Sequence, residues 1–175
     1  MSYDNERIAK TLLERLEANL PGQLDVVEAL WVTEGDPVTL PDPVTYFRGH
    51  KPTVLGEDST YFPFVAVLIM SRSPQGAPLR WGYQESNMPA FVDFFVVADD
   101  EDTVNKIASR YGEAIVLALQ EERYVAGYKQ DDWEPLVSIS EASRHPKTAA
   151  QADMFDDADV DFIQGGRVEI GFEGG

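Results

Sequence analysis

The sequence predicts an α+β fold in which helices pack on one face of an antiparallel sheet, with a long Pro-rich arm attached. Three observations support this prediction. The N-terminal segment has helical apolar spacing, segments 61–71 and 91–98 are strand-like, and segment 91–122 combines a strand, an acidic turn and an amphipathic helix. A strand that leads directly into an amphipathic helix needs a sheet on which that helix can lie. Segment 91–122 therefore organises our interpretation of the chain.

The composition is that of one folded domain, which we assign to residues 1–175. Apolar residues make up 43% of the chain and aromatic residues 11%, enough for a packed core. No apolar run approaches the ~20 residues of a membrane-spanning helix, and the first residues lack a signal-peptide pattern. Without cysteine, the chain has no disulfide or thiolate metal site and suits a reducing cytoplasm.

Acidic residues dominate the charge, with 31 Asp and Glu against 14 Lys and Arg and a net charge of −17. No run of basic residues is present, which argues against a groove that grips nucleic acid. The excess of acid has two interpretations. It either keeps the protein soluble or provides a surface that must not adhere to a polyanion.

Residues 3–20 are predicted to form the first helix, which ends at Pro21 and Gly22. Its apolar face consists of Ile8, Leu12, Leu13, Leu16 and Leu20. Segment 24–32 is apolar without a clear period, and it indicates either a short helical turn or a strand.

Segment 33–60 is rich in proline and glycine and lacks a regular pattern, but it contains Tyr46 and Phe47. A connection of this length greatly exceeds the usual ~4–6 residues, so we expect it to have a role. It is either a loop packed on its own domain or an arm that packs on a neighbouring subunit.

Segment 61–71 is predicted to be the first strand of the sheet. Both of its alternating faces are apolar, so one suits the helices and the other suits a further cover. Segment 72–89 is interpreted as the polar tip loop of a hairpin, and it carries Trp81 and Tyr83. In the strand that follows, Asp93 is the single charge, and it faces solvent, faces a neighbour or marks a site.

Four carboxylates at 99–102 stand where the free N–H groups and the dipole of a helix start favour anions. The predicted helix behind them carries an apolar stripe made of Val104, Ile107, Ala108, Tyr111, Ile115, Ala118 and Leu119.

The C-terminal third indicates shorter elements. Segment 124–129 is either a short strand or a turn, and segment 136–143 alternates in part, with its β-branched residues on one side. Segment 159–172 is predicted to form the last strand, in which Gly165 and Gly166 mark either a tight hairpin turn or a bulge.

No catalytic, cofactor-binding or metal-binding residues are predicted, and we expect no enzyme. The two histidines, His50 and His145, lie in Pro-flanked loops without partners nearby in the sequence. Phosphate-binding loops, dinucleotide-binding motifs and nucleophile elbows are absent. Segment 157–161 imitates the start of a calcium loop, but Phe162 and Val168 stand where the turn glycine and the bidentate Glu belong.

Several segments occur in a recognisable order. A first helix ends in Leu-Pro-Gly, a Pro-rich arm follows, and a strand opens with Tyr-Phe-Pro-Phe-Val-Ala-Val at residue 61. An outer hairpin strand, an acidic turn and a helix with Tyr-Gly-Glu-Ala-Ile at 111–115 come next, before Arg-Val-Glu-Ile-Gly-Phe at 167–172. This arrangement, over nearly the whole chain, resembles the tail terminator (tail completion) proteins of long-tailed bacteriophages and related tail-like particles.

The resemblance implies a structural, non-enzymatic virion protein of the tail or neck, made in the host cytoplasm. Such proteins form hexameric rings that cap the tail tube, stop its polymerisation and join it to the head connector or stopper protein. Viral DNA passes through the ring without sequence-specific binding, which an acidic ring suits. Because aromatic residues in long loops are favoured interface anchors, we predict that Tyr46, Phe47, Trp81 and Tyr83 contact a neighbouring subunit or another partner.

Two alternatives stay open. One is another head–tail joining protein or a tail tube subunit, which would polymerise instead of stopping at a ring. The other is a small cytoplasmic α+β enzyme or ligand-binding domain, which would show a concave pocket with convergent polar groups and perturbed pKa values.

Overall fold

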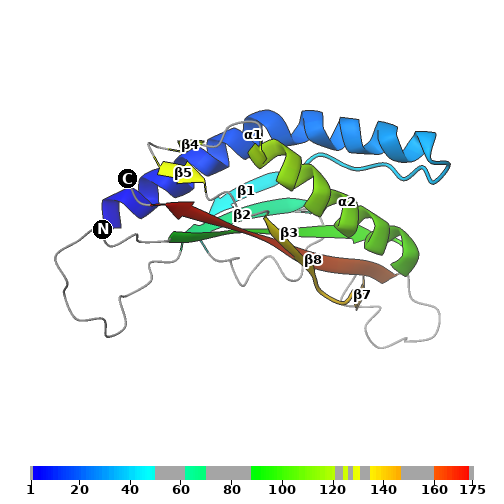
Figure 1. Ribbon diagram of the computed structural model, residues 1–175. Helices are drawn as coiled ribbons and strands as arrows, with labels where there is room; N and C mark the ends of the chain where they lie inside the picture. The colour runs from blue at the N-terminus through cyan, green and yellow to red at the C-terminus, as the bar shows by residue number, and fades with distance from the viewer. Residues whose placement is uncertain are drawn as a thin grey trace.

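The computed structural model describes residues 2–49, 62–69, 88–120, 124–125, 128–130, 135–146 and 160–173. In these ranges, two helices pack on one face of an eight-stranded sheet, which confirms the predicted α+β class (Figure 1). The elements are α1 (Ser2–Thr33), β1 (Thr45–Arg48), β2 (Phe64–Ile69), β3 (Met88–Ala98), α2 (Glu101–Gln120), β4 (Tyr124–Val125), β5 (Tyr128–Gln130), β6 (Leu136–Ile139), β7 (Ser143–Pro146) and β8 (Val160–Glu173).

The sheet has the order β1-β2-β3-β8-β5-β4, and β6 and β7 also pair with β8. Strands β5, β6 and β7 follow one another along one edge of β8, whose other edge pairs with β3. Among the described pairs only β1 and β2 are parallel, so the sheet is mixed and the antiparallel prediction needs this correction. The chain between Arg48 and Phe64 is long enough for the crossover of roughly a dozen residues that a parallel pair requires.

Helix α1 continues through Pro21 and Gly22, so the predicted helix end is wrong and segment 24–32 is helical. An interior proline costs about 3 kcal/mol of helix stability. Beyond it, however, Leu24 and Val27 continue the apolar face and are both 1% exposed. Full burial of each such side chain contributes roughly 1.5–3 kcal/mol, which offsets the cost. The helix changes direction near its middle, as expected for a proline kink (Figure 1).

Helix α2 follows β3 almost immediately and lies over β3 and β8 (Figure 1). Thr103 donates its backbone N–H to Asp100 Oδ1 over 2.8 Å, which caps the helix. Hydrogen bonds from Thr103 hold the pKa of Asp100 below its usual value. Every residue of the predicted α2 stripe is buried, as are Val92, Phe94 and Val96 of β3. The central strand–turn–helix prediction is confirmed.

Strand β8 pairs with β3 in one register along all 11 residues of β3. Gly165 and Gly166 therefore mark neither a hairpin turn nor a bulge in this pairing. They lie opposite Phe95 and Phe94, and a Cβ at either glycine would overlap the ring across from it. The two glycines are needed because the aromatic rings occupy the space that side chains would fill.

We expect Gly166→Ala to lower the free energy of unfolding by about 1–3 kcal/mol, as overpacking does in a filled core. The added Cβ would meet the ring of Phe94, which is fully buried and stacked 5.9 Å from Tyr111. Gly22→Ala is the matched control, since its Cβ would meet nothing within 4 Å inside a helix, and it should gain about 0.5–1 kcal/mol. Urea unfolding measures the free energy of unfolding of both variants. A Gly166→Ala variant as stable as the wild type would contradict the packing described.

Candidate functional site

The interface residues predicted from the sequence fall in two groups. Tyr46 and Phe47 lie in β1, the first strand of the sheet. Trp81 and Tyr83 lie outside the described residues, so their role stays a prediction. The predicted arm 33–60 is also described only in part, and its described part belongs to its own domain. Leu40 is 6% exposed and residues 45–48 join the sheet.

An ionic cluster ties the start of this segment to α2. Asp36 accepts hydrogen bonds from Lys106 Nζ over 3.0 Å and from Arg110 Nη2 over 2.6 Å. The Arg110 guanidinium is 3% exposed and lies 4.4 Å from the centre of the Trp31 ring in α1. The hydrogen bond from Lys106 is the main cause that lowers the pKa of Asp36. The cluster joins α1, the segment after it and α2.

Two further hydrogen bonds anchor the same segment before β1 begins. The Tyr111 hydroxyl of α2 donates to the Pro41 carbonyl, and Leu40 donates its N–H to Glu28 Oε2 over 2.8 Å. Burial raises the pKa of the Tyr111 hydroxyl, which keeps it a donor. The segment is thereby held against both helices, and these anchors fix the position at which β1 begins at the sheet edge.

Tyr46 and Phe47 point to opposite faces of the sheet, as neighbours in a strand must. Tyr46 packs on the core under the helices, where burial, together with Asp42 and Glu17, raises its pKa to about 12. Its hydroxyl is buried without a hydrogen-bond partner among the described residues. Phe47 packs on the other face of the sheet.

That other face carries an aromatic cluster. Phe64 lies at its centre, with ring centroids 5.7 Å from Phe47, 5.3 Å from Phe62 and 4.9 Å from Phe95. Phe64 is fully buried, whereas Phe47 and Phe95 are only half-buried. Both helices lie on the opposite face (Figure 1). Strand β2 thus has buried residues on both faces, as predicted.

Asp93, the odd charge of the sequence, has a structural partner. Arg167 lies directly across from it in β8 and donates from Nε over 2.6 Å and from Nη2 over 2.8 Å. The hydrogen bonds to Asp93 raise the pKa of Arg167, whose guanidinium also lies 4.6 Å from the centre of the Phe91 ring. The pair explains why a carboxylate occurs in this strand.

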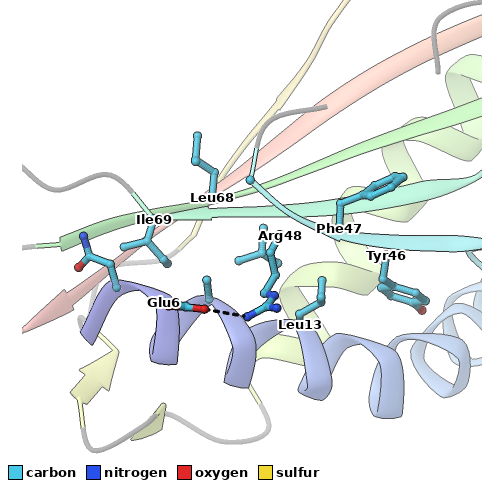
Figure 2. Close-up of a pocket in the computed structure, with 11 residues that line it drawn as sticks. Glu6, Leu13, Tyr46, Phe47, Arg48, Leu68 and Ile69 are labelled. Atoms are coloured by element: carbon cyan, nitrogen blue, oxygen red, sulfur yellow. Dashed lines mark ion pairs between the residues drawn. The ribbon is translucent and has the colours of Figure 1, made fainter. Parts of the chain in front are cut away.

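An open groove of about 640 Å³ lies between α1 and the β1 edge of the sheet. Figure 2 shows Arg48 reaching from β1 toward α1, where it pairs with Glu6 over 3.6 Å. Tyr46 and Leu13 lie on the same side, whereas Phe47 points away to the other face (Figure 2). The Arg48 and Glu6 side chains are 49% and 72% exposed, so this ion pair is worth at most about 1 kcal/mol.

The lining of the groove is mixed in character. Leu13 and Ile69 contribute apolar surface, whereas Asn5 and the exposed Glu6–Arg48 ion pair contribute polar groups. Within the described ranges, no group of three or more His, Cys, Asp or Glu side chains could hold a metal ion. His50 lies outside these ranges, His145 lies in β7, and of the calcium-like segment 157–161 only Asp161 and Val160 are described, both in β8.

Strand β6 carries a further exposed apolar surface that the sequence pattern did not indicate. Strand β6 exposes Leu136 to 65%, Val137 to 37% and Ile139 to 38%. Val137 and Ile139 point to one side, toward Gly112 of α2, as the alternation predicted. Their exposure follows from the position of β6 at the outer edge of β8, which no local pattern reveals.

No protein-family model matches the chain, and a comparison with curated proteins yields no significant match. In the described part of the chain, neither helix combines the length and apolar character that crossing a membrane requires.

The Asp36 cluster predicts a pH dependence. Because the folded-state pKa of Asp36 lies below the ordinary value of 3.8, its carboxylate stabilises the fold above pH 3.8. This contribution is lost as the pH falls below 3.8 and passes through the lowered pKa. Asp36→Asn should therefore be less stable than the wild type at neutral pH, with a difference that shrinks in acid. Urea unfolding from pH 7 to pH 2 measures it. Asp25→Asn, on an exposed part of α1, is the control, and a pH-independent difference for Asp36→Asn would contradict the prediction.

The two core tyrosines form a second matched pair. Tyr111→Phe should lower the free energy of unfolding by about 0.5–1.5 kcal/mol, because the hydrogen bond to the Pro41 carbonyl is lost. Tyr46→Phe should cause no loss, because it removes a buried hydroxyl that lacks a hydrogen-bond partner. Thermal or urea unfolding distinguishes the two, and equal losses would show that the Tyr46 hydroxyl is also paired.

Proposed function

We propose that the chain is a tail terminator protein of a long-tailed bacteriophage or a related tail-like particle. Its subunits would form a hexameric ring that caps the tail tube, stops polymerisation of the tube and joins it to the head connector or stopper protein. The proposal makes the chain a non-enzymatic structural protein of the virion neck, assembled in the host cytoplasm.

One observation carries the proposal: the sheet carries apolar side chains that the chain's own helices leave partly exposed. These side chains are the half-buried Phe47 and Phe95 on the face opposite the helices and the exposed apolar ones of β6. A ring subunit would cover such surfaces with its neighbours or with the tube. The order of elements in the sequence, which resembles that of tail terminators, supports the same function.

The mechanism is steric. A ring whose lower surface fits the last tube subunits, and whose upper surface differs from theirs, leaves no site for a further tube subunit. The net charge of −17 on each subunit repels the phosphates of viral DNA, which favours passage through the ring without sequence-specific binding.

The groove beside β1 gives little support to the alternative of an enzyme or a ligand-binding domain. Its volume is within the range of ligand pockets, but such pockets place a few polar groups in a largely enclosed apolar cavity. Here the charged groups, Glu6 and Arg48, are exposed and paired with each other.

The test is a capping assay with tail tubes purified from the particle that encodes this chain. We expect the wild-type protein to bind one tube end as a sixfold ring and to stop addition of tube subunits. Trp81→Ser with Tyr83→Ser should weaken capping and leave the unfolding midpoint unchanged. Val26→Ser, which alters a 57% exposed residue of α1, is the control and should cap normally.

Three results would count against this function. Open-ended filaments of the pure protein would indicate a tube subunit. A wild-type protein that never binds tubes, measured by electron microscopy and sedimentation, would contradict the terminator assignment. Loss of folding in the double variant would show that Trp81 and Tyr83 are structural and not contact residues.

A further inference from the structure

Among the described strands, β1 lies at one edge of the sheet, and β4, β6 and β7 lie at the other. Among the described residues, β1 pairs only with β2 and β6 pairs only with β8. All four residues of β6 are exposed, and β1 borders an open groove. Natural sheets usually protect such edges with charged residues, proline or a bulge, but the β6 sequence Leu-Val-Ser-Ile contains neither charge nor proline. Strand β6 can therefore accept or supply a further strand.

Neither β1 nor β6 contains an acidic residue, although acidic residues dominate the charge of the chain. Of the 31 Asp and Glu residues, none lies in β1 (Thr-Tyr-Phe-Arg) or in β6. Two copies with a net charge of −17 each repel one another, so their contact is least opposed where carboxylates are absent. The two edges are thus suited to a second copy of the same chain.

The side chains of β6 also match the groove beside β1. When a sheet continues from one subunit into another, residues on the helix side stay on the helix side. Val137 and Ile139 face that side, toward Gly112. On the same side of β1, a neighbouring copy offers the apolar groove walls Leu13 and Tyr46.

We propose that β6 of one copy adds to β1 of the next copy as a further strand, with Val137 and Ile139 entering the groove between α1 and β1 (Figure 2). The contact joins two different edges, so it is head-to-tail and closes into a ring when the rotation between copies permits. The inference rests on the proposed ring assembly and names the surfaces that build it.

Proline can block each edge separately. Val44 and Gly49, on either side of β1, both donate their N–H groups toward β2, so β1 departs from strict alternation. Ser140 donates its N–H toward β8, so the N–H of Val137 points outward. Val137→Pro removes an outward donor of β6, and Thr45→Pro places a proline in β1, where proline discourages pairing with a further strand. An unchanged unfolding midpoint for each variant shows that the subunit's own sheet is kept.

The experiment mixes the two blocked variants and measures mass by native mass spectrometry and analytical ultracentrifugation. At high concentration, we expect the wild type to form a discrete ring and each proline variant alone to remain monomeric. An equimolar mixture should form a one-to-one heterodimer, because the first variant retains an intact β6 and the second retains an intact β1. Only a head-to-tail contact between these edges predicts that result.

Other outcomes overturn the inference. A mixture that stays monomeric would place the contact elsewhere. Dimers of Thr45→Pro alone would indicate pairing of β6 with β6. A wild type that is monomeric at its highest soluble concentration would show that the copies do not associate. Leu136→Lys replaces Val137→Pro if the latter lowers the unfolding midpoint, since Leu136 is 65% exposed. Rings or tube caps formed by either blocked variant would refute this interface and leave the terminator function intact. Wild-type rings that fail to cap tubes would support this interface and refute the terminator function.

Discussion

The pairing of β3 with β8 is the constraint on which the rest of the structure depends. Its register continues along all 11 residues of β3, and it requires Gly165 and Gly166, because the Phe94 and Phe95 rings lie over them. Helix α2 starts directly after β3 and so must lie over this pair of strands. The opposite edge of β8 then receives β5, β6 and β7 in succession. One register thus determines both the position of α2 and the order of the strands at this side.

The same register gives the sheet two apolar faces of different kinds. Phe94 faces the helices and is fully buried, whereas its neighbour Phe95 faces the other way and is half-buried beside Phe64. A sheet with helices on one face usually has a polar second face. In β3 only Asp93 interrupts the apolar character of that face, and it is neutralised by Arg167. The second face is therefore suited to a cover other than the chain's own helices.

The centre of the fold was predictable because independent local signals agree there: a β-branched and aromatic strand, a capping Asp100 and an apolar stripe on α2. Prediction failed where distant contacts outweigh local preference. Pro21 lies within α1 because residues beyond it are buried against other elements. Strand β1 was not predicted because it lies in a Pro-rich segment whose position depends on contacts of Asp36 and Tyr111 between parts of the chain far apart in sequence. Of the candidate site, the sequence identified Tyr46 and Phe47 but not their opposite orientations, and it missed β6, whose exposure depends on which edge of β8 it occupies.

Charge and edge structure act together in this chain. An acidic protein resists association in general, because like charges repel at any approach, and this repulsion is strongest where carboxylates are dense. Strands without carboxylates are then the surfaces at which hydrogen bonds and apolar burial can exceed the repulsion. Here β1 and β6 lie at opposite edges of one sheet, and their side chains are apolar, uncharged polar or, in Arg48, basic. A contact between unlike ends leaves one free end of each kind after every addition. Under the proposed contact, addition would continue until the two free ends meet, and that closure would satisfy β1 and β6 of every subunit at once.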